Sequence, residues 1–257
     1  ISNRQQVTAP RFSKEQLDAL YSGELPFTDY LKLILKDNAD QQQHNVTITG
    51  GSEKIRYFVS GGYFKESGLF TSNMEYGKKY NLRTSVDGEL FEGLTFGVNL
   101  ALINSISNAP NGAVWNTFKN AWQIDPTENL YSNNDPAYLN QYIGAWDHPL
   151  AQISQTLSGY NLTNDKFLTS TFYLNYKVPF VQGLSTKILY AYDNNYSFNK
   201  SFRKQYSQYN YDQIAQTQAP FVHNGPSRLN EFFGQGRTND LQFSMNYQNK
   251  IGLHNIN

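Results

Sequence analysis

The alternation of apolar and polar residues constrains the fold of this chain more than any other feature. Beyond residue 43, aliphatic or aromatic residues take every second position in runs such as 55–63 and 94–102, with mainly polar residues between them. A period of two places the two kinds of side chain on opposite faces of a β-strand. Runs of this kind lie at 46–50, 55–63, 80–86, 94–102, 168–176, 184–192, 241–247 and from 251 onward. We therefore expect an all-β fold with about eight strands.

The lengths of the connections narrow the architecture further. Short turns are expected near 51–53, 87–93, 179–183 and 248–250, whereas the segments 65–78, 104–166 and 199–237 are long. Strict alternation of short turns and long loops is typical of an up-and-down antiparallel transmembrane β-barrel, here an incomplete set of strands. A soluble antiparallel sheet, such as a sandwich, also has one apolar face and is the alternative.

The composition excludes several other classes of protein. The 21 basic and 21 acidic side chains give no net charge, which argues against a nucleic-acid partner. The absence of cysteine excludes disulfides, thiolate nucleophiles and cysteine-ligated metals. No apolar run reaches the roughly 18 residues of a transmembrane helix. No apolar segment typical of a signal peptide opens the chain, so we expect it to be processed or incomplete.

Residues 1–43 lack the alternation and are expected to form a connector with two short helices. Ser13 and Gln16 have the spacing of a capping box immediately before Leu17. A second helix is expected after Asp29, where apolar residues up to Ile34 follow a helical spacing.

The long segment 104–166 is the most informative for function, because it contains all three tryptophans and many amide side chains. The spacing of Trp115, Phe118 and Trp122 predicts an amphipathic helix over 113–124. Aromatic faces can stack on sugar rings while amides and carboxylates bond to hydroxyl groups, so a neutral polar ligand is expected here. The residues expected to contact it are Trp115, Trp122, Trp146, Asp147, Tyr131, Tyr138 and Tyr142. In the alternative interpretation, the rings anchor the helix against neighbouring loops.

A second aromatic segment, 200–237, could bind the same ligand or a protein partner, since exposed aromatic residues and arginines are typical of interfaces. Its aromatic residues are Tyr206, Tyr209, Tyr211, Phe221, Phe232 and Phe233.

Catalytic chemistry has little support in the sequence. The histidines lie far apart, at His44, His148, His223 and His254. They do not form a metal-binding motif. Carboxylate pairs that could act as the acid and base of a glycosidase are Asp125 with Glu128 and Asp135 with Asp147. Aspartates in polar loops usually cap turns, so we expect neither carboxylate pair to be catalytic. From the histidines and the carboxylates together, we expect no catalytic residue, metal or cofactor, and no enzymatic activity.

The segment 43–58, QHNVTITGGSEKIRYF, together with SGGYF at 60–64 and ESG at 66–68, closely resembles the first barrel strands of SusC/RagA-type TonB-linked outer-membrane transporters. KYNLR at 79–83, GLTFGVN at 93–99 and HPLA at 148–151 add to the resemblance, although the family usually has Asn-Pro where this chain has His148-Pro149. Thr28-Asp29-Tyr30 resembles the Asp-Trp that precedes the barrel in the family, with Tyr in place of Trp.

The resemblance implies that the chain is part of a larger transporter in the bacterial outer membrane. Residues 1–43 would be the plug-to-barrel connector, and residues 44–257 the N-terminal part of a barrel of about 22 strands. Arg56, Arg83 and Lys187 would face the lumen and pair with carboxylates of the plug.

By the same resemblance, the whole protein would import a large nutrient, most often an oligosaccharide and sometimes a peptide. TonB, ExbB and ExbD would supply the energy, a SusD-like surface lipoprotein would cover the loops, and outer-membrane lipid would surround the barrel. Two alternatives are a passive small outer-membrane barrel or porin, and a soluble carbohydrate-binding or glycosidase β-domain.

Overall fold

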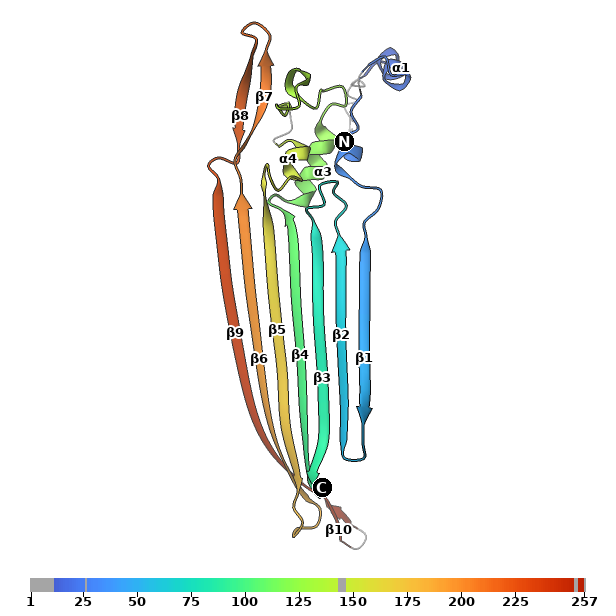
Figure 1. Cartoon of the computed structure of the whole chain (residues 1–257), viewed down its shortest axis with the longest axis vertical. Helices are drawn as coiled ribbons and strands as arrows, with labels where there is room; N and C mark the ends of the chain where they lie inside the picture. Colours follow the sequence, from blue (N-terminus) through green and yellow to red (C-terminus); the bar gives the residue numbers. More distant parts are fainter. Residues whose placement is uncertain (1–11, 26, 143–146, 252–253, 257) are drawn as a thin grey trace, which may run out of the picture.

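The computed structural model describes residues 12–25, 27–142, 147–251 and 254–256, and its main element is one antiparallel sheet of seven strands (Figure 1). The strands are β1 (Gln41–Gly51), β2 (Ile55–Ser67), β3 (Tyr76–Phe91), β4 (Leu94–Pro110), β5 (Gly159–Lys177), β6 (Leu184–Arg203) and β9 (Arg228–Tyr247). They pair in that order, so each strand lies beside its neighbour in the chain apart from a hairpin between β6 and β9. This is the predicted up-and-down arrangement.

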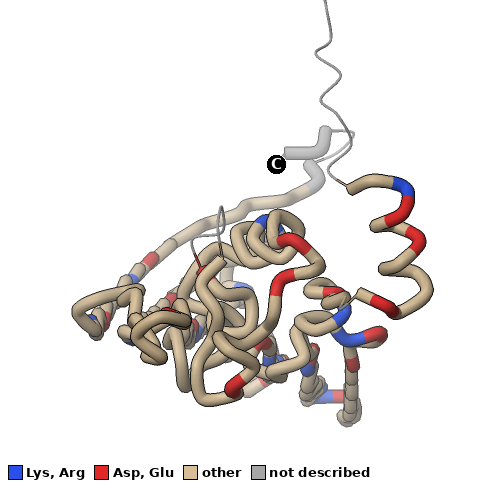
Figure 2. The backbone as a smooth tube through the Cα atoms, turned by 90° about the horizontal axis from the view of Figure 1, so that it is seen from above, with Lys and Arg blue, Asp and Glu red and all other residues tan. Residues whose placement is uncertain are grey.

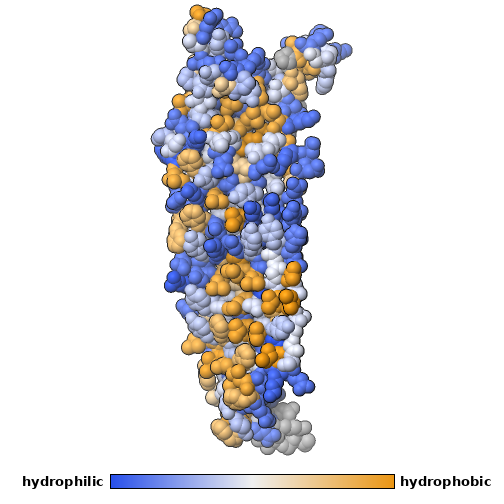
Figure 3. Space-filling view, viewed as in Figure 1, coloured by the Kyte–Doolittle hydropathy of each residue, from blue (hydrophilic) through white to orange (hydrophobic). Residues whose placement is uncertain are grey.

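The strand register joins the apolar positions of neighbouring strands into one band. Ile48 lies opposite Val59, and Ile188 lies between Leu174 and Phe243. We call the face that carries this band the outward face, and the opposite, mainly polar face the inner face. Figure 3 shows, in one view, hydrophobic residues gathered over the lower part of the strands and mainly hydrophilic residues above them.

The apolar band has no second protein layer against it. Leu241 and Phe243 are 73% and 65% exposed, and Pro110, at the loop end of β4, is the only buried aliphatic or aromatic side chain among the described residues of the seven-stranded sheet. A sandwich would bury this face against a second sheet. The structure therefore contradicts the soluble-sandwich alternative for the described part of the chain and agrees with a surface that contacts lipid.

The strands extend further than the alternation predicted, so the expected long loops are shorter than 65–78, 104–166 and 199–237. The structure has connections at 68–75, 111–158 and 204–227, and β6 and β9 each contain 20 residues. Apart from 87–91 in β3 and single residues in β1 and β5, the added residues lie at the end with the long connections, which we call the loop end. There the outward face carries polar residues such as Asn194 and Gln235 between apolar ones, so the alternation that marks a strand in the sequence is interrupted.

The opposite end, the turn end, has tight turns. Gly93, with φ of +86°, turns the chain between β3 and β4 in a conformation that favours glycine. The eighth strand predicted from Ile251 does not join the sheet. Instead, β10 (Asn249–Ile251) and β11 (His254–Ile256) pair only with each other, because the alternation there covers too few residues to specify a long strand.

Helices and a small hairpin gather at the loop end (Figure 1). They are α1 (Lys14–Ser22), α2 (Tyr30–Ile34), α3 (Val114–Gln123), η1 (Ser132–Asn134), α4 (Pro149–Gln152) and the hairpin of β7 (Tyr206–Asp212) with β8 (Thr217–His223). The predicted capping box of Ser13 and Gln16 is present, and Asp29 caps α2. None of the described helices is long and apolar enough to cross a membrane.

A compact hydrophobic core holds this group of elements together. We call residues 28–36, 68–75, 111–142, 147–158 and 204–227 the loop cluster. Its buried core consists of Tyr30, Ile34, Phe70, Ala121, Ile124, Tyr142 and Ile153. The chain therefore has two apolar regions, a buried core in the loop cluster and an exposed band on the sheet.

Candidate functional site

Helix α3 presents two tryptophans on the surface of the loop cluster. Phe118 points into the core, with its ring centroid 5.9 Å from that of Phe70, and Ala121 is buried beside it. Trp115 and Trp122 lie on another side of the helix and are 71% and 74% exposed. Within the described part of the chain, neither ring packs into the core, and the choice between ligand contact and anchoring on the barrel rim stays a prediction. Seven residues apart, they are separated by about 10 Å along the helix axis.

The tyrosines predicted to bind ligand differ in their exposure. Tyr131 and Tyr138 are half-buried, and Tyr138 contacts the edge of the Tyr209 ring at a centroid distance of 4.9 Å. Tyr142 is only 4% exposed, because it belongs to the core. The assignment of Tyr142 to a ligand-contacting surface is therefore wrong for this structure. Trp146 lies outside the described residues.

Tyr142 takes part in a buried hydrogen-bond chain. The Tyr30 hydroxyl donates to the Tyr142 hydroxyl at 3.0 Å, and the Tyr142 hydroxyl lies 3.2 Å from Nε2 of His148. His148 Nδ1 accepts from the backbone NH of Leu150, so Nε2 carries the proton and donates to the carbonyl of Leu130 at 3.2 Å. Burial, and to a smaller extent the nearby His223, lower the pKa of His148 to about 4 although the hydrogen bond to Leu130 opposes the change, so the ring is neutral near pH 7.

Asp147 connects the segment 147–158 to the β7–β8 hairpin within the loop cluster. Its Oδ1 accepts from the Tyr206 hydroxyl at 2.8 Å and lies 3.4 Å from Nδ1 of His223, which stacks on the Tyr206 ring. Burial favours a higher pKa for Asp147, but hydrogen bonds from His223 and Tyr206 outweigh it and lower the pKa. Asp147 is thus an ionised, partnered residue of the framework, with a third of its side chain still exposed.

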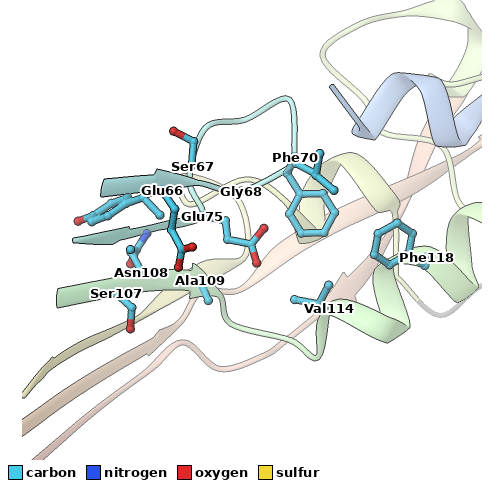
Figure 4. A pocket seen from close by; sticks show the side chains of 13 residues that line it. Glu66, Ser67, Gly68, Phe70, Glu75, Ser107, Asn108, Ala109, Val114 and Phe118 are labelled. Atoms are coloured by element: carbon cyan, nitrogen blue, oxygen red, sulfur yellow. The ribbon is translucent and has the colours of Figure 1, made fainter. Parts of the chain in front are cut away.

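A cavity of about 470 Å³ lies between α3 and the loop ends of β2, β3 and β4 (Figure 4). Glu66 and Glu75 point into it from one side, and Phe70, Val114 and Phe118 form the other side. Burial raises the pKa of Glu75, and the charge of Glu66 raises it further, while Lys36 opposes the change. This lining combines hydrogen-bond acceptors with aromatic rings, which suits a polar ligand with an apolar face.

The sequence analysis did not identify this cavity. Glu66 and Glu75 are nine positions apart with no motif between them, and both are distant in sequence from Phe118. Only the β2–β3 pairing and the position of α3 bring these side chains together.

On the inner face, two of the three predicted cations lie near one acidic residue. Arg56 is the cross-strand neighbour of Asp87, whose Oδ1 accepts from the Tyr173 hydroxyl at 2.6 Å. Nζ of Lys187 lies 5.0 Å from the centroid of the Tyr173 ring. The ring reaches across β4 because Gly97 has no side chain, and a Cβ atom there would clash with Tyr173.

Arg83 lies apart from this cluster on the same face of β3, opposite Ser60 and Ala101. The prediction that the three cations pair with a plug domain is not tested by the described residues. Arg56 and Lys187 do converge on one polar site near the turn end.

Of the carboxylates considered for catalysis, Asp125 and Asp135 stabilise turns, and Asp147 is bonded to Tyr206 and His223. Asp125 accepts hydrogen bonds from the backbone NH and hydroxyl of Thr127, and Asp135 accepts from the NH of Ala137. Within the described ranges, no group of three or more His, Asp or Glu side chains could hold a metal ion.

Seen from above, the loop cluster consists mainly of uncharged residues (Figure 2). This distribution agrees with the predicted preference for a neutral polar ligand. Together, the exposed rings of α3 and the cavity beside it make the loop end the candidate ligand-binding region.

Comparisons with known proteins identify relatives for part of the chain. No protein-family model matches it. The TonB-dependent receptor P26 of Formosa agariphila is 32% identical over 157 residues, covering 59% of this chain and 14% of that protein. The TonB-dependent receptor SusC of Bacteroides thetaiotaomicron is 33% identical over 112 residues, covering 42% of this chain and 10% of that protein.

Solved structures show the same fold. The RagAB peptide importer in its open-open state matches 88% of this chain and 24% of the compared chain, with a TM-score of 0.62 and 17% identity. The closed-closed state matches 86% of this chain and 31% of the compared chain, with a TM-score of 0.54 and 14% identity.

These findings confirm the predicted resemblance to SusC/RagA-type TonB-dependent transporters and the β-barrel fold class. The curated relatives are named TonB-dependent receptors, and the solved relatives are described as a peptide importer. The chain spans 14% and 10% of the curated relatives it matches.

Proposed function

We propose that this chain is the plug-to-barrel connector, residues 1–43, and the first part of the barrel, residues 44–257, of a TonB-dependent importer in the bacterial outer membrane. The single-layer sheet carries this proposal, because its exposed apolar band faces one way and its polar face the other. Such a sheet is stable when lipid covers the band and water fills the interior.

The imported nutrient in this proposal is an oligosaccharide, captured at the loop end. Trp115 and Trp122 offer exposed ring faces, and the adjacent cavity offers the acceptors Glu66 and Glu75. The low charge of the loop cluster also suits a neutral ligand. A peptide is the second candidate, since a structural relative is described as a peptide importer.

The proposed partners are a SusD-like lipoprotein over the loop cluster and the TonB, ExbB and ExbD proteins on the periplasmic side. The relatives with TonB-dependent receptor names and the RagAB structures support this proposal. Arg56, Lys187 and Arg83 would bind carboxylates of the plug, which would fill the polar interior.

The test for ligand binding uses the complete receptor and a panel of oligosaccharides and peptides. The Trp115→Ala and Trp122→Ala variants should each weaken binding of the preferred ligand by about twofold to tenfold, because each removes one aromatic stacking surface. Calorimetric titration measures this change. Phe180→Ala is the matched control, since Phe180 is an equally exposed ring at the turn end, 85% exposed.

Equal affinity in the tryptophan variants and the control would contradict this ligand site. The transport mechanism is tested separately in cells with a protonophore. Energy-dependent import requires that uptake of the ligand stops when the proton gradient collapses, whereas uptake through a passive porin would continue.

A further inference from the structure

Positively charged side chains project from the outward face just beyond the apolar band, toward the loop end. Lys65 and Lys78 are two residues beyond Tyr63 and Tyr80, and Lys166 is two residues beyond Leu168. On β9, Arg237 is four residues beyond Leu241, and the register places it level with Leu168. Two residues of a strand span about 7 Å, so Lys65, Lys78 and Lys166 each lie about one headgroup depth beyond the last residue of the apolar band on their own strand.

Carboxylates are nearly absent from the same face. Among the outward positions of the seven strands, only Glu231 is acidic, and it lies close to the loop end, where it pairs with Lys200 at 3.0 Å. The ion pairs found among the described residues include none of Lys65, Lys78, Lys166 and Arg237. The inner face differs, since it carries acidic residues such as Asp87 and Asp165.

Lys65 and Lys78 are direct cross-strand partners on β2 and β3. Like charges in this position repel each other and weaken the strand pairing. The next outward residue on β1 is Gln42, and the next on β4 is Ile106, so neither neighbour neutralises the pair. A bound anion between the two ammonium groups would convert this repulsion into attraction.

Aromatic rings border the cations on the membrane side. His44, Tyr63 and Tyr80 form one row, with centroid distances of 6.3 Å between the first two and 5.1 Å between the last two. Tyrosines in such a row mark the level where hydrocarbon meets headgroups. The long connections identify the loop end as the extracellular side, so the cations lie at the outer leaflet.

We propose that Lys65, Lys78, Lys166 and Arg237 bind phosphate groups on lipid headgroups of the outer leaflet, with the Lys65–Lys78 pair as the main site. A lipid is the ligand we commit to, because the cations border a lipid-facing apolar band and not a cavity. The inference depends on lipid contact of the outward face and is independent of nutrient import.

The test uses the complete receptor in nanodiscs of a phosphate-free glycolipid that contain either bisphosphorylated lipid A or dephosphorylated lipid A. Native mass spectrometry measures how much of each lipid stays bound. The wild-type receptor should retain the phosphorylated lipid preferentially. Lys65→Gln and Lys78→Gln should each weaken retention about fivefold, and the double variant about 25-fold.

Lys79→Gln is the matched control, because Lys79 is adjacent to Lys78 on β3 but lies on the inner face. Retention should be unchanged in this control and in Lys78→Arg, which keeps the charge. Equal retention of the two lipids, or an equal loss in Lys79→Gln, would overturn the proposal. Displacement of the lipid by inorganic phosphate at equal concentration would also overturn it, because the site would then bind free anions.

Thermal unfolding without the phosphorylated lipid gives a second readout and needs only the single variants. Lys78→Gln removes one of two like charges that repel each other across the strands. Its unfolding temperature should therefore equal or exceed that of the wild type. A clear decrease would mean that Lys78 stabilises the strand pairing itself, contrary to the proposal.

Discussion

His148 makes the stability of the loop cluster depend on pH. It is fully buried, caps α4, and bonds through both ring nitrogens to Leu130 and Leu150. Its pKa of about 4 in the folded chain lies below the ordinary value of 6.5, because burial disfavours the charged ring. Between these two values the unfolded chain binds a proton that the folded chain does not.

We therefore expect the loop cluster to be fully stable above pH 6.5 and to lose stability as the pH falls toward 4, by on the order of 3 kcal/mol at most. Hydrogen exchange of the loop cluster at several pH values measures this loss. His148→Gln should remove most of the pH dependence, although it lowers stability throughout. His44→Gln is the control, because His44 lies on the exposed outward face of β1 and should leave the profile unchanged.

The sequence predicted the positions of some functional residues correctly and missed others. The helical spacing correctly placed Trp115 and Trp122 on one helix, because that spacing is local information. Tyr142 was assigned to the surface, although it is buried, because a tyrosine suits both environments and its partners Tyr30 and His148 come from other segments. Glu66 and Glu75 were missed because their meeting depends on tertiary structure alone.

At the scale of single elements, α3 links the loop cluster to the strands. One side of the helix packs on Phe70, which is 2% exposed and comes from the β2–β3 connection. The core of the cluster is small, so each large ring contributes much of its stability.

Phe70→Ala should destabilise the loop cluster by about 3 to 5 kcal/mol, because it leaves a cavity in a small core. Limited proteolysis should then cut the connections at the loop end much faster than in the wild type. The strands should stay protected, since their contacts are separate. Trp115→Ala removes a ring of similar size from the surface and should not change the proteolysis rate, so equal cutting in both variants would contradict this view of the core.

The limits of the strands show where prediction from sequence ends. Alternation identified all seven strands of the sheet, because lipid on one side and water on the other require residues of opposite polarity. Beyond the bilayer both faces of a strand contact water, so the two faces no longer need residues of opposite polarity. The runs predicted at 184–192 and 241–247 therefore correspond to the apolar parts of β6 and β9, and their polar extensions appeared to be loops.

At the scale of the whole molecule, the main feature of the sheet is that its outward face is apolar and suits lipid, whereas its inner face is polar and suits water. In β9, Leu241 and Phe243 lie on the outward face, and Gln242 between them lies on the inner face. Substitutions at these three consecutive positions therefore test which face of the sheet contacts lipid.

In the complete receptor, Phe243→Arg should destabilise the barrel by about 2 to 4 kcal/mol, since Phe243 lies inside the apolar band, where a charge is costly. Gln242→Arg should have little effect, because its side chain enters the aqueous interior. Reversible folding into lipid vesicles, followed by gel mobility, measures both variants. Comparable losses in the two variants would show that lipid does not contact this face.

In the proposed importer, the length of the strands would raise the entrance above the cell surface. A strand of 20 residues, such as β6, is about 66 Å long, whereas the apolar part of a bilayer is about 25 Å thick. Even with a tilt of about 40°, the sheet rises roughly 25 Å beyond the lipid. Nutrients would thus meet the protein at the rim of a tall funnel, in open medium, before they come near the membrane.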